Sequence, residues 1–174
     1  MSTPTAPLRS EHRDLLPHLE HLRVVADSVG DLNDAALLVQ VDDACEFLTN
    51  HLIPHARAED DALYPVVARL MGSPAATATM SRDHVAVVSL VDELRAASQA
   101  LAREGATDVV ADDLRRTLYG LYALVKTHFA KEEEIYLPLL DARLTLDEAT
   151  EMFAKMEQAA HRAKKRPATS ERSS

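Results

Sequence analysis

The chain has 174 residues, of which 47% are apolar and 27% charged, a composition typical of a globular domain with a sizeable core. No apolar run approaches the ~20 residues that a membrane-spanning helix needs. The N-terminus also lacks the basic-then-apolar order of a secretory signal. The single Cys45 excludes an intramolecular disulfide and a multi-thiolate metal site. We therefore expect a cytoplasmic protein.

The charge is unevenly distributed along the chain. The formal net charge is −9, but residues 161–174 carry five basic residues and one acidic residue, which leaves −13 for the rest (−9 − 4). An acidic body repels nucleic acid and anionic membrane surfaces. We therefore expect small-molecule partners, no nucleic acid or membrane partner, and a monomer or weak dimer. Residues 163–174 are predicted to form a disordered basic tail.

A first helix is predicted after a flexible N-terminus at residues 1–9. Its apolar residues recur at three- and four-residue steps from Ser10 onward, and Gly30 is a plausible glycine just past its end. Pro17 leaves two alternatives, because a proline inside a helix removes a backbone hydrogen bond. Either the helix is kinked there, or its regular part begins near Asp14 and His12 lies on an irregular first turn.

Three more long helices are predicted at residues 35–64, 81–103 and 108–136. Pro54 interrupts the helix at 35–64 and Pro65 ends it, and Pro138 ends the helix at 108–136. Thr145 and Glu148 form a capping-box pattern ahead of an accessory helix. No segment alternates as an exposed strand would. The fold class is therefore all-α: an antiparallel up-down-up-down four-helix bundle with a short accessory C-terminal helix, spanning residues 10–162.

A candidate metal-ligand pair lies in the segment that runs from His128 to Pro138. Four residues separate His128 from Glu132, so both side chains lie on one face of a helix. An isolated pair of this kind is weak evidence for a metal site. The pattern is repeated, however, because His55 and Glu59 have the same spacing and are followed by Pro65 at the same distance.

The preceding helices repeat as well. His12 and His84 each precede apolar residues at helical spacing; they lie 72 residues apart (84 − 12), and His55 and His128 lie 73 apart (128 − 55). This pattern indicates a duplicated helical hairpin. The approximate two-fold symmetry of such a bundle would bring six side chains inward at similar depth: His12, His55, Glu59, His84, His128 and Glu132.

Four imidazoles and two carboxylates without a thiolate suit iron, manganese or zinc, and two ions better than one. If both glutamates bridge, each ion receives two histidines and two carboxylate oxygens, and positions remain for water or a small diatomic molecule. Two other interpretations stay open. The bundle could bind metal only as a binding or sensing module, or its histidines could hold no metal or adventitious zinc.

These motifs resemble the hemerythrin-like (HHE cation-binding) domain family of bacterial non-haem di-iron proteins over residues 8–140. The resemblance implies a four-helix bundle and two iron ions with a bridging oxo or hydroxo group. By position, it assigns His12 and His55 to one iron and His84 and His128 to the other, with Glu59 and Glu132 bridging.

The chain differs from the oxygen-carrying hemerythrins, which have a second histidine where this chain has Val88. They also have an aspartate five residues after the last histidine, where this chain offers Glu132 at four and Glu133 at five. These differences disfavour reversible oxygen carriage. They favour redox chemistry with hydrogen peroxide, dioxygen or nitric oxide, and the resemblance to bacterial members of the family implies a catalase-like or redox and stress role. The alternative is an iron- or oxygen-binding or sensing module without turnover.

The other candidate residues have less specific patterns. Tyr136 lies four residues after Glu132, where it could ligate iron or hydrogen-bond a bound peroxide as a tentative catalytic residue, or pack at the end of the bundle. His51 could lie beside the ligands, although we favour a non-ligand. Seven of the remaining side chains are predicted at the surface: His18, His21, His161, Asp60, Asp61, Glu133 and Glu134. Cys45 is predicted in the core. One of the four acidic side chains is available to orient a ligand histidine.

Overall fold

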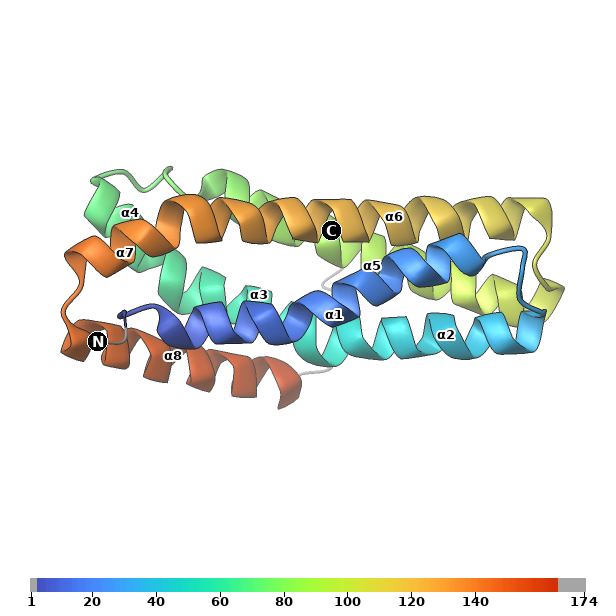
Figure 1. Cartoon of the computed structure of the whole chain (residues 1–174), viewed down its shortest axis with the longest axis horizontal. Coiled ribbons are helices and arrows are strands. Elements are labelled where there is room, and N and C mark those ends of the chain that lie inside the picture. Colours follow the sequence, from blue (N-terminus) through green and yellow to red (C-terminus); the bar gives the residue numbers. More distant parts are fainter. Residues whose placement is uncertain (1–2, 166–174) are drawn as a thin grey trace, which may run out of the picture.

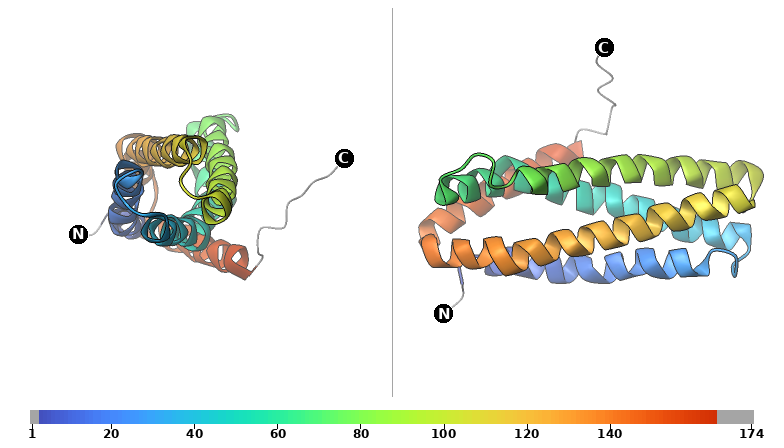
Figure 2. Two further views of the ribbon diagram at one scale, coloured as in Figure 1. Left: turned by 90° about the vertical axis from the view of Figure 1, so that its right-hand side faces the viewer. Right: turned by 90° about the horizontal axis from the view of Figure 1, so that it is seen from above.

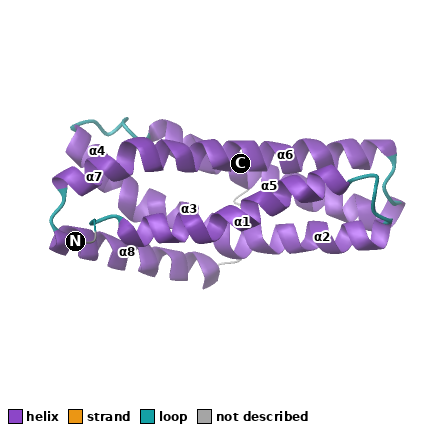
Figure 3. Cartoon of the chain, viewed as in Figure 1, coloured by secondary structure: helices purple, strands orange, loops and turns teal. Residues whose placement is uncertain are grey.

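The structure is a computed structural model that describes residues 3–165, and every regular element in this range is helical (Figure 3). Four arms form the bundle. They are α1 (Ala6–Ser28); α2 (Asp34–Phe47), η1 (Leu48–Leu52), α3 (Ile53–Ala58), η2 (Glu59–Leu63) and α4 (Tyr64–Met71); α5 (Ala78–Glu104); and α6 (Asp108–Lys131), η3 (Glu132–Tyr136) and α7 (Leu137–Arg143). The accessory helix is α8 (Leu146–Lys165). The all-helical prediction is confirmed.

The four arms lie side by side along the long axis of the molecule, and each arm leads back toward the end where the previous one began (Figure 1). Seen end-on, they occupy the corners of a square, and α8 lies outside it (Figure 2). The accessory helix packs on α3 and η2. Between residues 3 and 165, no helix is both long and apolar enough to cross a membrane.

Each proline of the second and fourth arms follows a π-helical turn. Pro54, Pro65 and Pro138 stand near the first position of α3, α4 and α7, directly after η1, η2 and η3. A proline has no N–H to donate and its ring clashes with a carbonyl one turn earlier, so a widened turn lets the helix continue. The predicted ends at Pro65 and Pro138 are therefore wrong, because the arms continue to Met71 and Arg143.

Both termini differ from the sequence-based boundaries. α1 begins at Ala6 and passes through Pro17, so residues 6–9 of the expected flexible segment are helical and His12 lies on regular helix. Arg9 also forms ion pairs with Glu133 and Asp141. At the other end α8 reaches Lys165, whereas the rest of the predicted basic tail, residues 166–174, lies outside the described residues.

Local sequence accounts for the starts of two helices. The Asn33 side chain accepts a hydrogen bond from the Ala36 N–H at 3.0 Å and caps α2. The predicted capping box of α8 is present, because Thr145 Oγ1 accepts from the Glu148 N–H at 3.2 Å and Glu148 Oε2 accepts from the Thr145 N–H at 2.9 Å.

The interior consists of two apolar layers separated by one polar layer. One apolar layer extends from Leu15, Ile53, Val87 and Phe129 toward the α1–α2 turn. The other extends from Leu8, Ala58, Met80 and Tyr136 toward α8. On every arm, the candidate ligands interrupt the apolar sequence between these two layers. Among the described residues, the fold therefore places all its buried histidine and glutamate side chains at one level.

Candidate metal centre

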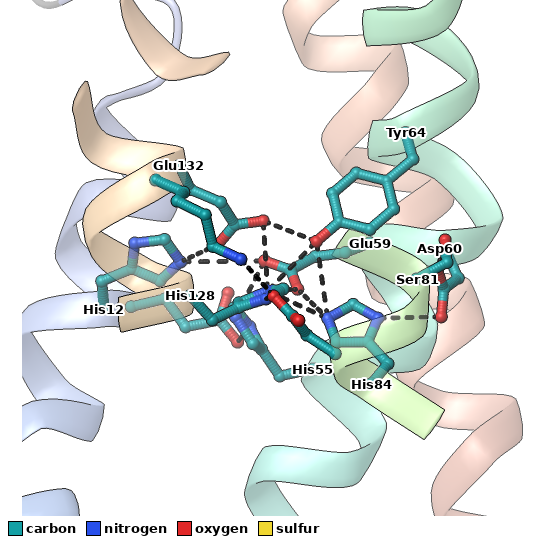
Figure 4. A network of polar contacts seen from close by, with 12 residues as sticks. His12, His55, Glu59, Asp60, Tyr64, Ser81, His84, His128 and Glu132 are labelled. Atoms are coloured by element: carbon teal, nitrogen blue, oxygen red, sulfur yellow. Dashed lines mark hydrogen bonds and ion pairs between the residues drawn. The ribbon is translucent and has the colours of Figure 1, made fainter. Parts of the chain in front are cut away.

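The polar layer contains the six predicted ligands, and all six are buried. His12 comes from α1, His55 and Glu59 from α3 and η2, His84 from α5, and His128 and Glu132 from α6 and η3. Their exposed fractions lie between 0% and 7%. Figure 4 shows these side chains converging from the four arms. Both glutamates begin π-helical turns, which are common at functional sites because they redirect side chains.

Glu59 is the central residue of the cluster. Its Oε1 lies 3.0 Å from His55 Nε2 and 3.7 Å from His12 Nε2. Its Oε2 lies 3.2 Å from His84 Nε2 and 3.8 Å from His128 Nε2. One carboxylate therefore directs one oxygen at each pair of histidines. Two groups of three ligand atoms are spaced closely enough to hold a metal ion, and both include Glu59. One group is His12, His55 and Glu59, and the other is Glu59, His84 and His128.

Glu132 completes the cluster on its other side. Its Oε2 lies 3.4 Å from His12 Nε2, and its Oε1 lies 3.6 Å from His128 Nε2. Glu132 thus faces one histidine of each pair, from the hairpin opposite to that of Glu59. The two carboxylates have equivalent positions in the repeat, but Glu59 lies close to all four imidazoles and Glu132 close to two.

Several buried polar atoms of the cluster have no hydrogen-bond partner among the described residues: His12 Nε2, both nitrogens of His55, both oxygens of Glu59 and Oε2 of Glu132. A buried polar group without a partner is costly, and a buried carboxylate more so. A cation between these atoms removes that cost. The donor set, imidazole nitrogen with carboxylate oxygen, therefore fits a transition-metal ion.

The ionisation of the two carboxylates differs in the absence of a cation. Burial raises the pKa of Glu132, and the negative charge of Glu59 raises it further, to well above the usual carboxyl range. Burial also opposes ionisation of Glu59, but His55, His12 and His128 outweigh burial and hold the pKa of Glu59 well below that range. Glu59 is therefore the more readily ionised carboxylate of the pair.

Each of the four histidines has a carboxylate on its outward side. His12 Nδ1 lies 2.9 Å from Glu133, His84 Nδ1 2.9 Å from Asp60, and His128 Nδ1 3.2 Å from Asp83. His55 Nδ1 lies 3.1 Å from Glu11, with poorer alignment. A carboxylate that accepts the Nδ1–H fixes the tautomer and leaves Nε2 free to ligate. We call these four residues the outer carboxylates.

The outer carboxylates also follow the repeat. Glu11 and Asp83 directly precede the first histidine of each hairpin, and Asp60 and Glu133 directly follow each bridging glutamate. The sequence indicated an orienting role for one acid near the glutamates, and Asp60 and Glu133 have this geometry. Glu11 and Asp83 were missed, although the repeated acid-histidine dipeptide was the signal that could have identified them.

Tyr64, which was not among the predicted site residues, lies at the cluster, whereas Tyr136 does not. Tyr64 is buried, and its hydroxyl donates to Glu132 Oε1 at 2.8 Å and lies 3.1 Å from His128 Nε2 (Figure 4). The Tyr136 hydroxyl instead donates to the Ala76 carbonyl at 3.1 Å, outside the cluster. Tyr64, and not Tyr136, therefore has its hydroxyl beside the predicted ligands, because η3 turns position 136 away from them.

The other histidines lie outside the cluster. His18 and His51 are exposed, His21 is half-buried, and all three line hollows between α1 and the second arm. His161 is exposed on α8. Cys45 is partly buried against the core, as expected.

Comparison with known proteins agrees with this geometry. The family model described as "Hemerythrin HHE cation binding domain" matches residues 3–140 and, in a second alignment, residues 75–171. The two matches begin 72 residues apart (75 − 3), the same offset that separates His12 from His84. Neither the curated proteins nor the solved structures gave a match. The buried His/Glu layer is a metal-binding site, and the chain belongs to the hemerythrin HHE cation-binding domain family.

Proposed function

We propose that this chain is a non-haem di-iron protein that reacts with hydrogen peroxide, dioxygen or nitric oxide, in a catalase-like or redox and stress role. His12 and His55 would hold one ion and His84 and His128 the other, and Glu59 and Glu132 would bridge them. The position of Glu59 carries this proposal, because its two oxygens lie 3.0 Å from His55 Nε2 and 3.2 Å from His84 Nε2.

Iron would supply the redox chemistry, and the chain supplies oriented ligands, a site shielded from water and a hydrogen-bond donor. The outer carboxylates hold each imidazole with Nε2 directed inward, so the ligands need little rearrangement to bind. Phe129 stacks on His12 with ring centroids 4.3 Å apart and excludes water from one side of the cluster. In a dry site, charges interact more strongly than in water.

Tyr64 is the group best placed to donate a hydrogen bond to a small molecule. Its hydroxyl lies 3.1 Å from His128 Nε2 and 3.4 Å from His84 Nε2, directly beside one histidine pair. It already donates to Glu132, so it can transfer a hydrogen bond from the carboxylate to an incoming oxygen atom.

A binding or sensing module without turnover is the second candidate. The buried polar atoms without hydrogen-bond partners favour this candidate, because a bound metal ion offsets the free-energy cost of burying them. Metal occupancy is thereby linked to the stability of the bundle. Such a module would show metal-dependent melting and no consumption of peroxide.

Oxygen evolution and melting temperature separate the two candidates. We expect iron-loaded protein to bind two irons per chain and to evolve oxygen from hydrogen peroxide, with most of the activity lost in Tyr64→Phe. Iron that raises the melting temperature while peroxide persists would favour the sensing module instead. Absence of bound iron after anaerobic loading would contradict both.

A further inference from the structure

Three histidines outside the centre lie together beside it. The chain has eight histidines, and four belong to the centre. His18, His21 and His51 line two adjoining hollows of about 260 and 350 Å³ between α1 and the second arm. Both hollows are lined by His18, Phe47 and His51 and therefore form one groove, which ends at the centre ligand His55. We call this the histidine groove.

Metal-ligating residue types line both walls of the histidine groove. On α1, four such residues recur at three- and four-residue steps and so share one helix face: Glu11, Asp14, His18 and His21. The second arm supplies Asp43, Glu46, His51 and His55. The only basic side chain other than histidine on the lining is Lys164 of α8, so the groove attracts cations.

The imidazoles of the groove are free to bind. Among the described residues, His18, His21 and His51 form neither a side-chain hydrogen bond nor an ion pair. Phe47 stacks with His18 at 4.7 Å and with His51 at 6.2 Å between ring centroids, with interplanar angles of 14° and 16°. This stacking orients the rings and leaves their nitrogen edges available.

The inner end of the groove meets buried atoms that need a cation. His55 lines the groove, and neither of its nitrogens has a hydrogen-bond partner of good geometry in the described structure. Beside it, Glu11 is half exposed, with 51% of its side chain accessible. Side chains that can ligate a metal therefore follow one another from the surface, through Glu11, to the centre.

The duplication does not require these histidines. The positions equivalent to His18, His21 and His51 in the second hairpin are Leu90, Glu93 and Leu124. The three imidazoles are thus specific to the hairpin whose arms form the groove, and they are not a by-product of the repeat that created the centre.

We propose that the histidine groove binds a divalent first-row transition ion in passage and delivers it to the centre, which makes the groove the metal-loading route. This inference rests on the proposed function, because it needs a centre that binds metal. Imidazole with carboxylate suits such ions. The binding is transient, because among the described residues only the two groups in the centre bring three ligand atoms within 4.8 Å of one another.

Metal uptake by the stripped full-length chain tests this route. Cobalt(II) serves as the probe, because its visible absorption reports entry into the centre. In the triple variant His18→Gln, His21→Gln, His51→Gln, the uptake rate should fall several-fold, because the imidazoles that hold the ion in passage are gone while the acidic side chains of the groove remain. The final stoichiometry and spectrum should equal those of the unmodified chain. The matched control is His161→Gln, which replaces an exposed histidine of α8 outside the groove. This variant should take up cobalt(II) at the rate of the unmodified chain.

An uptake rate equal to that of the control would overturn the loading route while leaving the proposed function intact. A triple variant that loads fewer ions would also overturn it, because the histidines would then belong to a permanent site. If the unmodified chain bound no metal, the proposed function itself would fail. Circular dichroism verifies that the stripped chains are folded, and the single His51→Gln variant, with a smaller expected slowing, replaces a triple variant that misfolds.

Discussion

The two helical hairpins, residues 6–71 and 78–143, agree at the ligands of the centre and differ in the residues around it. Each supplies two buried histidines, one buried glutamate and two outer carboxylates. Around them, Tyr64 of the first hairpin corresponds to Leu137 of the second, and Ala56 corresponds to Phe129. One histidine pair therefore faces a phenol and the other a phenyl ring. The duplication preserved the ligands, whereas the surroundings diverged.

Substitution of Glu59 or Glu132 by glutamine should have the largest effect on metal binding. The two substitutions should also show that these glutamates are not equivalent. In Glu59→Gln we expect both ions to be lost, because Glu59 approaches all four imidazoles within 3.8 Å. In Glu132→Gln we expect a weaker loss, because Glu132 approaches only two of them. Metal analysis after dialysis measures both. Equal losses would contradict the central position of Glu59.

Removal of an outer carboxylate should reduce metal affinity about 10- to 100-fold, the usual effect of a residue that orients a ligand histidine. Asp60→Asn should lie at the upper end, because Asp60 bonds both His84 and Ser81. Glu11→Gln should lie at the lower end, because its contact with His55 is half exposed and poorly aligned. Competition with a chelator gives the two affinities, and the reverse order would refute this ranking.

The pair Tyr64→Phe and Tyr136→Phe sharpens the difference between the hairpins. Loss of the Tyr64 hydroxyl removes the donor to the buried Glu132 and should cost about 1–3 kcal/mol of unfolding free energy in the metal-free protein. Tyr136→Phe leaves the Ala76 carbonyl without its donor and should cost about 1 kcal/mol. Urea unfolding measures both. Only Tyr64→Phe should alter the spectrum of the iron-loaded protein, and a change in Tyr136→Phe would restore Tyr136 as a site residue.

The smallest difference between the hairpins concerns Cys45, and it should be visible only in the rate at which its thiol is alkylated. Its counterpart in the second hairpin is the fully buried Leu118, and burial followed by the charge of Asp42 raises the pKa of the Cys45 thiol to about 11. A raised pKa means less thiolate at a given pH, so alkylation at pH 8 should be much slower than for a free cysteine and should accelerate only as the pH approaches 11. Mass spectrometry after iodoacetamide treatment measures this, and rapid labelling at pH 8 would contradict the core assignment.

The sequence predicted the helical class and the six side chains that converge, because helical periodicity and a duplication both leave direct signals in it. It misled at the prolines, since a π-helical turn that lets a helix pass Pro65 has no signal in spacing rules. The same turns place Tyr136 outside the cluster, because a widened turn rotates every later side chain. Glu11 and Asp83 could have been found from the repeat, but their partners on neighbouring arms depend on the packing.

An anomalous difference map from crystals of the iron-loaded protein, recorded on both sides of the iron absorption edge, tests the central claim most directly. We predict two iron peaks in the polar layer, one beside His12 and His55 and one beside His84 and His128, with Glu59 contacting both. A single peak, or a signal that persists below the iron edge, would contradict a di-iron centre.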